Sequence, residues 1–481
     1  MPGVREIRLA AMKQAAPKEC LFLMPRLAII EPTISAGGVE RFIHGLIGGA
    51  MEERITDDWE IVLVRTRLNS AGIHVPWPQH LRAPNLRVQY LDPENPVFRA
   101  LNWLSTSGRV FGIPGTGMLK RTFARVIRSI GPVRWKAYCG ETRCWIENYL
   151  RRNRFDVVYF SYPDFLDTPR VKAPMVATLH DFTFKHGLTA SAEHQRLLDN
   201  HMREWLEACS QVVVSSQFVA DDLKRFYPAW AHKPHLIRLG IPSAEREPTA
   251  LEVEAFRQRH GLPERFVLVV GWIVEHKNQK VVFEAVAKLR DRGLHIPVVC
   301  VGPNSKMLTD SVIPKNPKML AAMYVAQIRE FCESAELKNG TDYFSLGYVD
   351  DVEVECLHRS AMMLIAPALT EATSLPAREA MRAGCPVAYA RTPPYEEEMQ
   401  LIEGNAWMFP THDSSALAEI IAAVANNGEE AQRRAAEAKN IVPRIFSWRK
   451  TARAYFSLFE QAAGVQRTEQ EEQATSITSP A

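Results

Sequence analysis

The sequence predicts an α/β protein with two domains, each a parallel sheet covered by helices. With 481 residues the chain exceeds what one hydrophobic core usually holds, so two domains of roughly 200 residues each are expected. Apolar segments of strand length alternate with amphipathic segments of helix length, which is typical of a doubly wound sheet. The alternation breaks at residues 234–246 and then starts again. Two successive Rossmann-like domains are the simplest account of this pattern.

The first domain is expected over residues 26–240. Its opening strand, 26–31, leads into the loop residues Gly37 and Gly38 and then into an amphipathic helix that ends near Glu53. A strand, a glycine loop and a helix in this order can cradle a phosphate, although two glycines alone are a weak signal. The pattern predicts further strands at 60–65, 86–91, 157–160, 175–179 and 211–214, and helices at 192–209 and after 217.

The second domain is expected over residues 241–446. The pattern predicts its strands at 266–271, 298–302, 342–346 and 362–365, and its helices at 279–292, 322–334 and 352–358. A final amphipathic helix is predicted at 447–463. Residues 1–25 form an N-terminal extension in this scheme. The tail 464–481 is rich in Gln, Glu, Thr and Ser and is expected to be disordered.

The first domain contains a long basic helical excursion at residues 99–153. Between Phe98 and Arg154 the chain holds twelve basic and two acidic residues with aromatic residues among them, whereas the net charge of the whole chain is only +3. This composition suits an anionic membrane surface, where each Lys or Arg contributes roughly 1 kcal/mol. It would equally suit nucleic acid, although no nucleic-acid partner is expected. Solvated helix faces with the aromatic residues in the core are an open alternative.

The sequence predicts a cytoplasmic protein. No apolar run approaches the roughly 18 residues that a membrane-spanning helix needs. Charged residues near the N-terminus leave no continuous apolar stretch for a signal peptide. The eight cysteines include no C-x-x-C pair, which favours reduced thiols over disulfides or a zinc site. The candidate membrane contact is peripheral attachment to the inner face of the membrane through residues 98–154.

The most informative stretch of the chain contains Glu371 and Glu379, eight positions apart. The apolar run 362–365 predicts a buried strand and Pro376 predicts the first turn of a helix, so the segment between them is a strand-to-helix loop. In open α/β sheets such loops bind ligands, because they lie at the carboxyl ends of strands and the helix start offers N–H groups to an anion. Both carboxylates can accept hydrogen bonds from hydroxyls. Hydroxyls and phosphate together indicate a nucleotide sugar.

Further short runs accompany this stretch in a fixed order along the chain. They are residues 37–41, 176–181, 213–216, 270–278, 301–302, 346–349 and 446–448. With the block 371–387, they make the chain resemble the retaining, nucleotide-sugar-dependent glycosyltransferases of the GT-B architecture that carry the E-x7-E motif, often called group 1. The resemblance covers residues 26–463. It implies two Rossmann-like domains that face each other across a cleft, and a C-terminal helix that crosses back to the first domain.

The resemblance implies roles for three charged residues of the second domain. Glu371 is expected to approach the hydroxyls of the donor sugar, and Glu379 is expected to bind the ribose of the nucleotide. Lys277, just past a strand end, is expected to neutralise the leaving diphosphate, for which preorganised charge is usually the largest catalytic contribution. The family usually has a second cation directly after the strand glycine, where this chain has Trp272. Candidates for its replacement are Arg238, Arg378 and an arginine of the first domain, and the alternative is that backbone amides carry more of the charge.

The phosphate loop of this chain departs from the family pattern. The family's Glu-Gly-Phe-Gly-Leu-Pro reads Glu-Ala-Thr-Ser-Leu-Pro here, so two glycines are lost and the backbone is more restricted. The amides of Thr373, Ser374 and Leu375 are expected to face the phosphate, and the two hydroxyls can donate to it as well. The rest of the donor site is expected at Gly302, Tyr348 and Val349.

In the first domain, His180 is the main candidate for a catalytic residue. It follows a predicted strand, and the resemblance implies that it presents its imidazole to the sugar or to the acceptor. Asp181 is expected to orient the ring. Gly37 and Gly38 would let the backbone approach the diphosphate or the acceptor. No protein general base is assigned, because the leaving phosphate is thought to help deprotonate the acceptor, and no Asp-x-Asp motif calls for a metal. We therefore expect no metal and no cofactor beyond the donor.

The expected function is transfer of a hexose from a nucleotide diphosphate sugar to a saccharide or a lipid-linked saccharide, in the synthesis of a cell-surface polysaccharide or glycoconjugate. Trp272 and the altered loop motivate one alternative, an inactive protein that binds nucleotide sugars as a scaffold. Phosphorylases and sugar-nucleotide epimerases share the fold but fit the block 371–387 poorly. A dehydrogenase is excluded because no predicted strand is followed by G-x-G-x-x-G.

Overall fold

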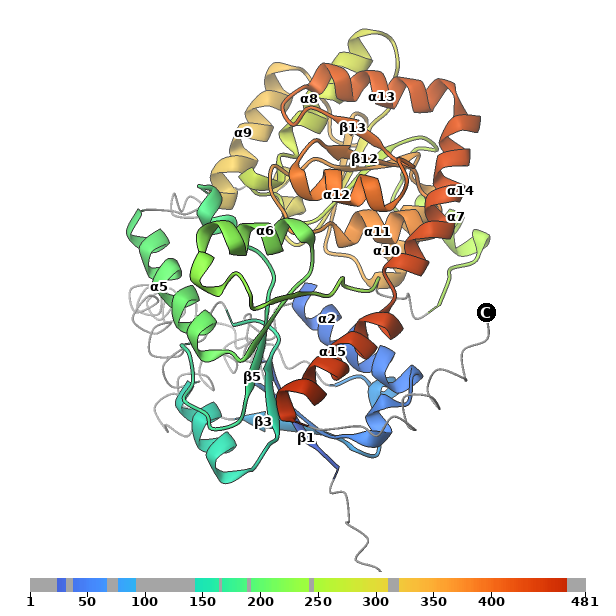
Figure 1. The fold of residues 1–481 in the computed structure, drawn as a ribbon. Helices are drawn as coiled ribbons and strands as arrows, with labels where there is room; N and C mark the ends of the chain where they lie inside the picture. Colours follow the sequence, from blue (N-terminus) through green and yellow to red (C-terminus); the bar gives the residue numbers. More distant parts are fainter. Residues whose placement is uncertain are drawn as a thin grey trace, which may run out of the picture.

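The computed structural model describes residues 24–31, 38–66, 77–91, 143–163, 167–187, 192–241, 246–309 and 320–464. These residues form two α/β domains, one stacked above the other, each built on a sheet whose paired strands are parallel (Figure 1). The predicted fold class is therefore confirmed. Gly37, residues 99–142 of the basic excursion, most of the N-terminal extension and nearly all of the tail lie outside the described residues.

The first domain holds a seven-stranded sheet in the order β3-β2-β1-β4-β5-β6-β7. Its strands are β1 (Arg26–Glu31), β2 (Glu60–Thr66), β3 (Leu86–Leu91), β4 (Val157–Phe160), β5 (Met175–Leu179), β6 (Gln211–Val214) and β7 (Pro234–Leu236). The helices α2 (Gly38–Glu52), α5 (Ala192–Ala208) and α6 (Gln217–Phe226) pack against this sheet. The direction of winding reverses between β1 and β4, and in such sheets ligands bind at this switch.

The second domain holds a six-stranded sheet in the order β10-β9-β8-β11-β12-β13. Its strands are β8 (Val267–Val270), β9 (Val298–Val301), β10 (Tyr343–Gly347), β11 (Met363–Ala366), β12 (Val387–Ala390) and β13 (Trp407–Phe409). Its helices are α7 (Ala250–Arg259), α8 (Lys280–Asp291), α9 (Leu320–Ser334), α10 (Asp351–Ser360), α11 (Leu375–Ala383), α12 (Pro393–Leu401), α13 (Ser414–Asn426) and α14 (Gly428–Ile445). Buried apolar clusters lie on both faces of the sheet.

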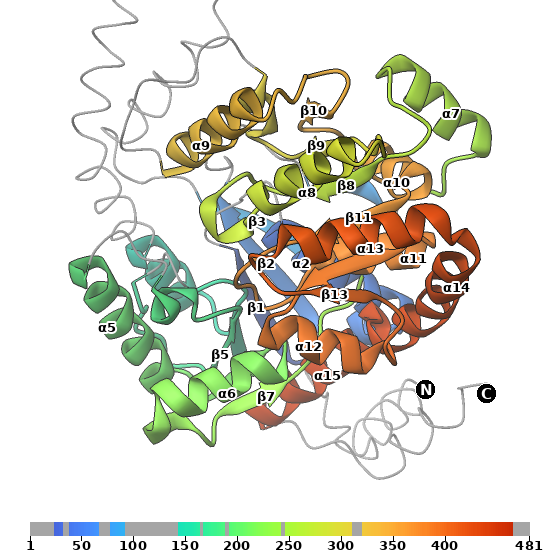
Figure 2. The ribbon, with the colours of Figure 1, turned by 90° about the horizontal axis from the view of Figure 1, so that it is seen from above.

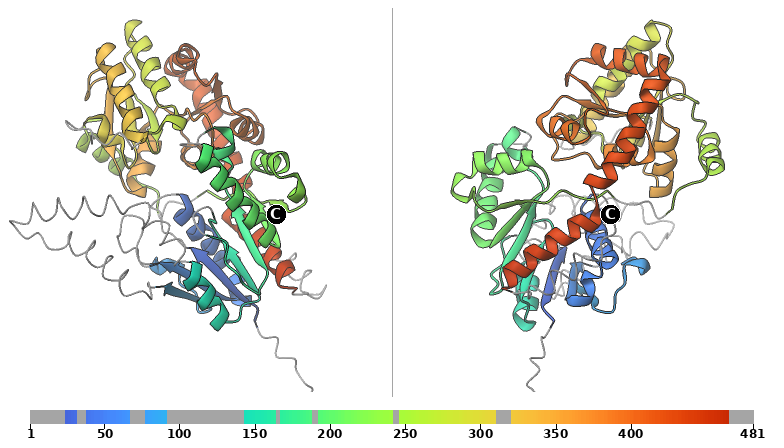
Figure 3. Two further views of the ribbon diagram at one scale, coloured as in Figure 1. Left: turned by 90° about the vertical axis from the view of Figure 1, so that its left-hand side faces the viewer. Right: turned by 45° about the vertical axis from the view of Figure 1, so that its right-hand side comes forward.

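The last helix, α15 (Trp448–Ala463), leaves the second domain and packs on the first, beside α2 (Figure 3). Its Tyr455 hydroxyl lies 2.8 Å from the Thr178 hydroxyl in β5. At the crossing point the Trp448 ring sits against two glycines, and a β-carbon at Gly45 or Gly240 would collide with it. The predicted return of the C-terminal helix is confirmed, and these glycines provide the space for it.

The two domains also meet where α12 approaches the start of α6 (Figure 2). The carboxylate of Glu397 on α12 accepts hydrogen bonds from the backbone N–H groups of Gln217 and Phe218, both at 3.0 Å. An acidic side chain at a helix N-terminus is stabilised by the unpaired N–H groups and by the helix dipole. Arg238 of the first domain donates to the same carboxylate at 2.9 Å. This contact holds the domains close along one side of the cleft.

Among the described residues, no helix has both the length and the apolar character that crossing a membrane requires.

Candidate functional site

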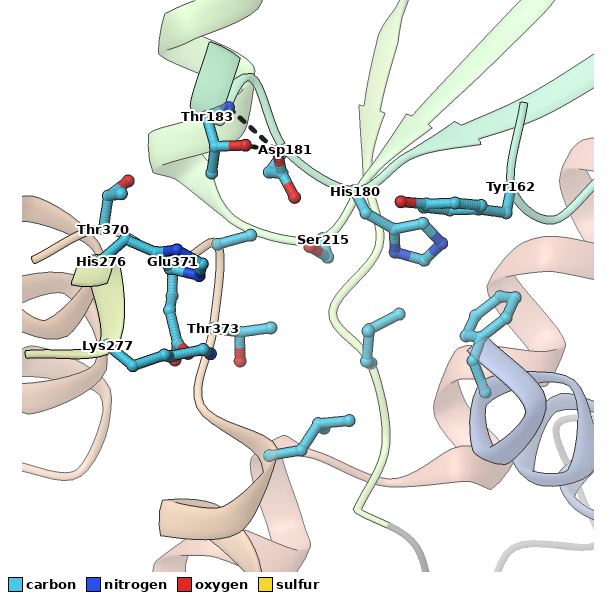
Figure 4. A pocket seen from close by; sticks show the side chains of 14 residues that line it. Tyr162, His180, Asp181, Thr183, Ser215, His276, Lys277, Thr370, Glu371 and Thr373 are labelled. Atoms are coloured by element: carbon cyan, nitrogen blue, oxygen red, sulfur yellow. Dashed lines mark hydrogen bonds and ion pairs between the residues drawn. The ribbon is translucent and has the colours of Figure 1, made fainter. Parts of the chain in front are cut away.

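A cavity of about 310 Å³ opens between the two domains (Figure 4). The first domain contributes side chains that follow β4, β5 and β6, while the second contributes those that follow β8 and β11. The lining residues that carry polar groups are Tyr162, His180, Asp181, Thr183, Ser215, His276, Lys277, Thr370, Glu371 and Thr373. The carboxyl ends of both parallel sheets thus face one cavity, which is the usual ligand position in such sheets.

Lys277 and Glu371 form an ion pair at the second-domain wall of this cavity (Figure 4). Lys277 ends the short 3-10 turn after β8, and Glu371 lies in the loop after β11. The buried Tyr395 hydroxyl donates a hydrogen bond of 2.7 Å to the second oxygen of Glu371. The Leu369 N–H donates to the His276 carbonyl at 2.8 Å and ties the two loops together. A cation and a carboxylate are therefore held side by side by two separate contacts.

Burial shifts the ionisation of the two basic residues on the 3-10 turn. It lowers the pKa of Lys277 to about 8, and the Asp181 carboxylate across the cavity partly opposes the change. Burial also lowers the pKa of His276 to about 4, with the Lys277 charge acting in the same direction. At neutral pH Lys277 is thus a cation and His276 a neutral ring. A cation with a lowered pKa in a cleft is typical of a functional site.

The loop before α11 is fixed from below by the buried carboxylate of Glu398. Glu398 accepts hydrogen bonds from the Thr373 hydroxyl at 2.8 Å and from the Ser374 N–H at 3.4 Å. The Ser374 hydroxyl caps α11 by accepting from the Ala377 N–H at 3.4 Å. The Thr373 hydroxyl, which was expected to donate to phosphate, therefore donates within the protein instead, and the Ser374 hydroxyl is buried as the helix cap. The N–H groups of Thr373 and Leu375 have no hydrogen-bond partner among the described residues, so they can receive an anion.

Glu379 lies one turn further along α11 and is only 3% exposed. Its carboxylate forms an ion pair of 2.6 Å with Arg41, which comes from α2 in the other domain. Burial raises the pKa of Glu379 to about 7, against the opposing charge of Arg41. The two glutamates are thus unequal in their surroundings. Glu371 faces the cavity, whereas Glu379 lies behind the start of α11 at the domain interface.

His180 is positioned by the carbonyl of Ser161, which lies 2.8 Å from its Nε2. A carbonyl can only accept, so Nε2 carries the proton and Nδ1 of the neutral ring is an acceptor. Burial lowers the pKa of His180, although the Ser161 bond and Asp181 oppose the change, so the neutral form is favoured. The Phe42 ring meets the imidazole edge-on at 5.6 Å.

The expectation that Asp181 orients this ring needs correction. Its carboxylate accepts hydrogen bonds from the N–H and the hydroxyl of Thr183, at 2.9 and 2.7 Å (Figure 4). The Ser161 carbonyl has the orienting role, because it lies at the end of the neighbouring strand. Asp181 lines the cavity with its other oxygen free of these two bonds.

The remaining predicted donor residues lie at neighbouring strand ends of the second domain and outside the described lining of the cavity. The Gly302 N–H donates to the Gly347 carbonyl at 2.9 Å, and a β-carbon at Gly302 would collide with the Gly271 carbonyl. Tyr348 follows and is 71% exposed, whereas Val349 is buried. The ends of β8, β9 and β10 therefore come together at Gly271, Gly302 and Gly347.

In the first domain, Gly38 of the predicted glycine loop is the first residue of α2.

The structure adds residues that the sequence patterns did not single out as functional. They are Arg41, Phe42, Tyr162, Ser215, His276, Tyr395 and Glu398. Arg41, Ser215 and His276 did stand in the short runs 37–41, 213–216 and 270–278, but nothing local indicated their partners or roles. Among the described residues, no group of three or more His, Cys, Asp or Glu side chains could hold a metal ion.

Two family models match the chain. Residues 252–441 match the model described as glycosyl transferases group 1, and residues 114–245 match the model described as glycosyltransferase family 4. The first match contains Lys277, Glu371 and Glu379, and the second contains His180. No curated protein sequence matches the chain.

Several solved structures are similar to this one over most of its length. Sucrose-phosphate synthase from Thermosynechococcus elongatus superposes with a TM-score of 0.63 at 17% identity, covering 92% of this chain and 100% of that chain. HepE from Anabaena in complex with UDP-glucose has a TM-score of 0.61 at 15% identity, with 91% and 99% covered. WaaG, a glycosyltransferase involved in lipopolysaccharide biosynthesis, has a TM-score of 0.55 at 15% identity, with 91% and 99% covered. At these identities the likeness establishes a shared fold.

Proposed function

Because this protein is a glycosyltransferase with a group 1 domain on the GT-B fold, we propose that it transfers a hexose from a nucleotide diphosphate sugar with retention of configuration. The acceptor is a saccharide or a lipid-linked saccharide. The observation that carries this proposal is the Lys277–Glu371 pair in the cavity between the domains, beside the unpaired N–H groups at the start of α11. Glu371 can accept hydrogen bonds from sugar hydroxyls there, and Lys277 with the N–H groups can bind a diphosphate beside it.

In this proposal the second domain holds the donor. Glu371, fixed by Tyr395, accepts hydrogen bonds from the sugar hydroxyls. Lys277 and the N–H groups of Thr373 and Leu375 take the diphosphate, whose negative charge grows as the bond to the sugar breaks. Glu379 receives the ribose hydroxyls. The base lies toward Gly302, Tyr348 and Val349.

The first domain presents the acceptor side of the cavity. The neutral His180 offers Nδ1 to a hydroxyl of the sugar or of the acceptor. The acceptor oxygen forms its bond to the anomeric carbon while the bond to the diphosphate breaks on the same face. The proton of the acceptor hydroxyl passes to an oxygen of the leaving diphosphate, so no protein base is required. Asp181 and Ser215 line the same wall and can bind acceptor hydroxyls.

The pathway and the place of action are proposals from the comparisons and the sequence. WaaG acts in lipopolysaccharide biosynthesis, and by analogy we place this protein in the synthesis of a cell-surface polysaccharide or glycoconjugate. The complex of HepE with UDP-glucose makes a UDP-sugar the first donor to test, before GDP- and ADP-sugars. The basic segment 98–154 would attach the enzyme to the inner face of the membrane, and no metal is required.

The rate of transfer is expected to fall as pH rises through about 8 or slightly above. The pKa of Lys277 is lowered to about 8, so the ammonium that neutralises the diphosphate is lost above this pH. The Glu371 carboxylate favours the charged form and moves the limit upward. The measurement is kcat/KM against pH, which reports groups of the free enzyme. Lys277→Arg should move the alkaline limit out of the range, and an unchanged profile in this variant would assign the limit to another group.

A donor screen tests the proposed function directly. UDP-, GDP- and ADP-glucose are added at increasing concentration, and the unfolding temperature is followed. The donor should stabilise the protein by about 2.7 kcal/mol when present at 100 times its Kd. Release of the nucleoside diphosphate is then measured with saccharide acceptors, and NMR of the product gives the anomeric configuration. Binding without release on any acceptor would favour the scaffold alternative, and an inverted product would exclude retention.

A further inference from the structure

Both motif glutamates are paired with a cation in the structure. Glu371 is paired with Lys277 from the same domain, and Glu379 is paired at 2.6 Å with Arg41 from the other domain. In the proposed function both carboxylates must turn to hydroxyls of the donor, one to the sugar and the other to the ribose. Each cation then loses its partner at the moment when a diphosphate arrives. In the proposed function Lys277 then pairs with the diphosphate. Arg41 needs a new anionic partner as well.

The donor site is short of positive charge without Arg41. Among the described residues that line the cavity, Lys277 is the one Lys or Arg side chain. The position directly after Gly271, the glycine that follows β8, is Trp272, which is half exposed. Arg238 donates to Glu397 at 2.9 Å, and the buried Arg378 donates to Glu398 at 2.7 Å. The proposed function gives neither Glu397 nor Glu398 a hydroxyl of the donor to bind, so donor binding frees neither of these two arginines.

Arg41 stands close to the position where the diphosphate is expected. The next residue, Phe42, lines the cavity. Glu379 follows Leu375, which also lines the cavity, by four residues on α11, so the two lie on one helix face about 6 Å apart along the axis. The Arg41 side chain is 30% exposed, and within the part of the chain that the structure describes it has one weaker ion pair besides Glu379, with Asp351 at 3.8 Å. The Arg41 side chain is long and partly exposed, so its guanidinium can move along α11 by about 5 Å, the length of one helical turn.

We propose that Arg41 exchanges partners when the donor binds: the ribose hydroxyls take Glu379, and the guanidinium moves to the diphosphate as the second cation of the site. The inference rests on the proposed function and names the residue that replaces the missing cation at Trp272. The planar guanidinium suits phosphate because it can donate two parallel hydrogen bonds. Since Arg41 belongs to the first domain, the same contact would draw the domains together around a donor that carries its phosphates.

The test compares nucleoside diphosphates with the matching monophosphates by calorimetry, using UDP and UMP, GDP and GMP, and ADP and AMP. In the wild-type protein the diphosphate should bind more tightly than the monophosphate. Arg41→Ala should reduce this advantage by about tenfold or more, the effect of losing a hydrogen bond between charged groups. Arg41→Lys should keep part of it, because it keeps the charge. Arg41→Gln serves as a second neutral variant if the alanine variant folds poorly.

Two controls separate the exchange from a structural role. Arg82→Ala removes an exposed arginine of the same domain and should leave both affinities unchanged. Glu379→Gln should abolish the preference for the ribonucleotide over its 2′-deoxy counterpart, and it should leave the ratio of diphosphate to monophosphate affinity intact. Loss of both affinities by an equal factor in Arg41→Ala would mean that the pair only holds the domains together, which overturns the inference alone. A wild-type protein that binds none of the three diphosphates would overturn the proposed function as well.

Discussion

Replacement of Lys277 by methionine should lower kcat roughly 100- to 1000-fold, the effect of removing one preorganised group from a developing negative charge. Methionine keeps an unbranched stem of four atoms, like that of lysine, and lacks the ammonium. The lysine contacts Glu371 and faces the cavity, whereas the second cation would have to come from the first domain. The measurement is release of nucleoside diphosphate under saturating donor and acceptor. The unfolding temperature should stay near that of the wild type, because the pair lies at the cavity wall and not in a core.

The matched control for this variant is Lys280→Met. Lys280 lies three residues further along the chain, is 38% exposed and forms a longer ion pair of 3.7 Å with Glu284 on the same helix. Such exposed pairs contribute about 0.3–0.5 kcal/mol and have no part in the chemistry. The control should keep full activity. A Lys277→Met protein that retains more than a tenth of the wild-type rate would remove Lys277 from the role assigned to it.

The rate losses caused by substitutions at Lys277 and at Glu371 should not be additive. If Lys277 and Glu371 act on one donor molecule as a unit, the double variant Lys277→Met with Glu371→Gln should lose about as much rate as the worse single variant. Independent roles would instead multiply the two losses. The comparison needs only the three variants and the assay of nucleoside diphosphate release.

The strands of this protein were predictable because parallel strands with both faces covered are continuous apolar runs. The predicted bounds of β1, β3, β4, β5 and β6 agree with the structure to the residue. Shorter and less regular elements were not assigned. The three residues of β13 carry too little pattern, and α14 contains Pro443 near its end. The chain between 393 and 445 therefore received no elements from the pattern, although four elements of the second domain lie there.

The site was predictable where function depends on local sequence. Lys277, Glu371 and His180 each follow a strand closely, so the end of the strand places them at the cleft. The partners that hold them were not predictable. Tyr395 reaches Glu371 from 24 positions away, and Arg41 reaches Glu379 across the domain interface. No periodicity connects residues at such separations. The Thr373 hydroxyl was misjudged for the same reason, because the sequence does not reveal that Glu398 lies beneath it.

Removal of the Glu398 carboxylate should strongly destabilise the protein. It is 3% exposed and accepts hydrogen bonds from Arg378 at 2.7 Å, Thr373 at 2.8 Å and Tyr389 at 3.0 Å. Glu398→Ala leaves the buried Arg378 charge without its partner, which typically costs about 3–5 kcal/mol. For a domain of roughly 200 residues, this corresponds to a fall of about 6–20 °C in the unfolding temperature. The loop of Thr373 loses its support in the same variant, so the KM for the donor should rise.

Two further contacts keep the Arg378 charge in its buried position when Glu398 is removed. Its guanidinium lies over the Phe446 ring at 3.7 Å and donates to the Leu239 carbonyl at 3.4 Å, so it is held between the domain connection and the start of the crossover. The control is Glu396→Ala on the same helix, where a half-exposed carboxylate pairs with Arg391 at 3.4 Å. Exposed pairs of this kind contribute about 0–1 kcal/mol. Equal unfolding temperatures for the two alanine variants would show that water reaches Arg378 once Glu398 is gone, and the support of the phosphate loop would then have to come from the cap at Ser374.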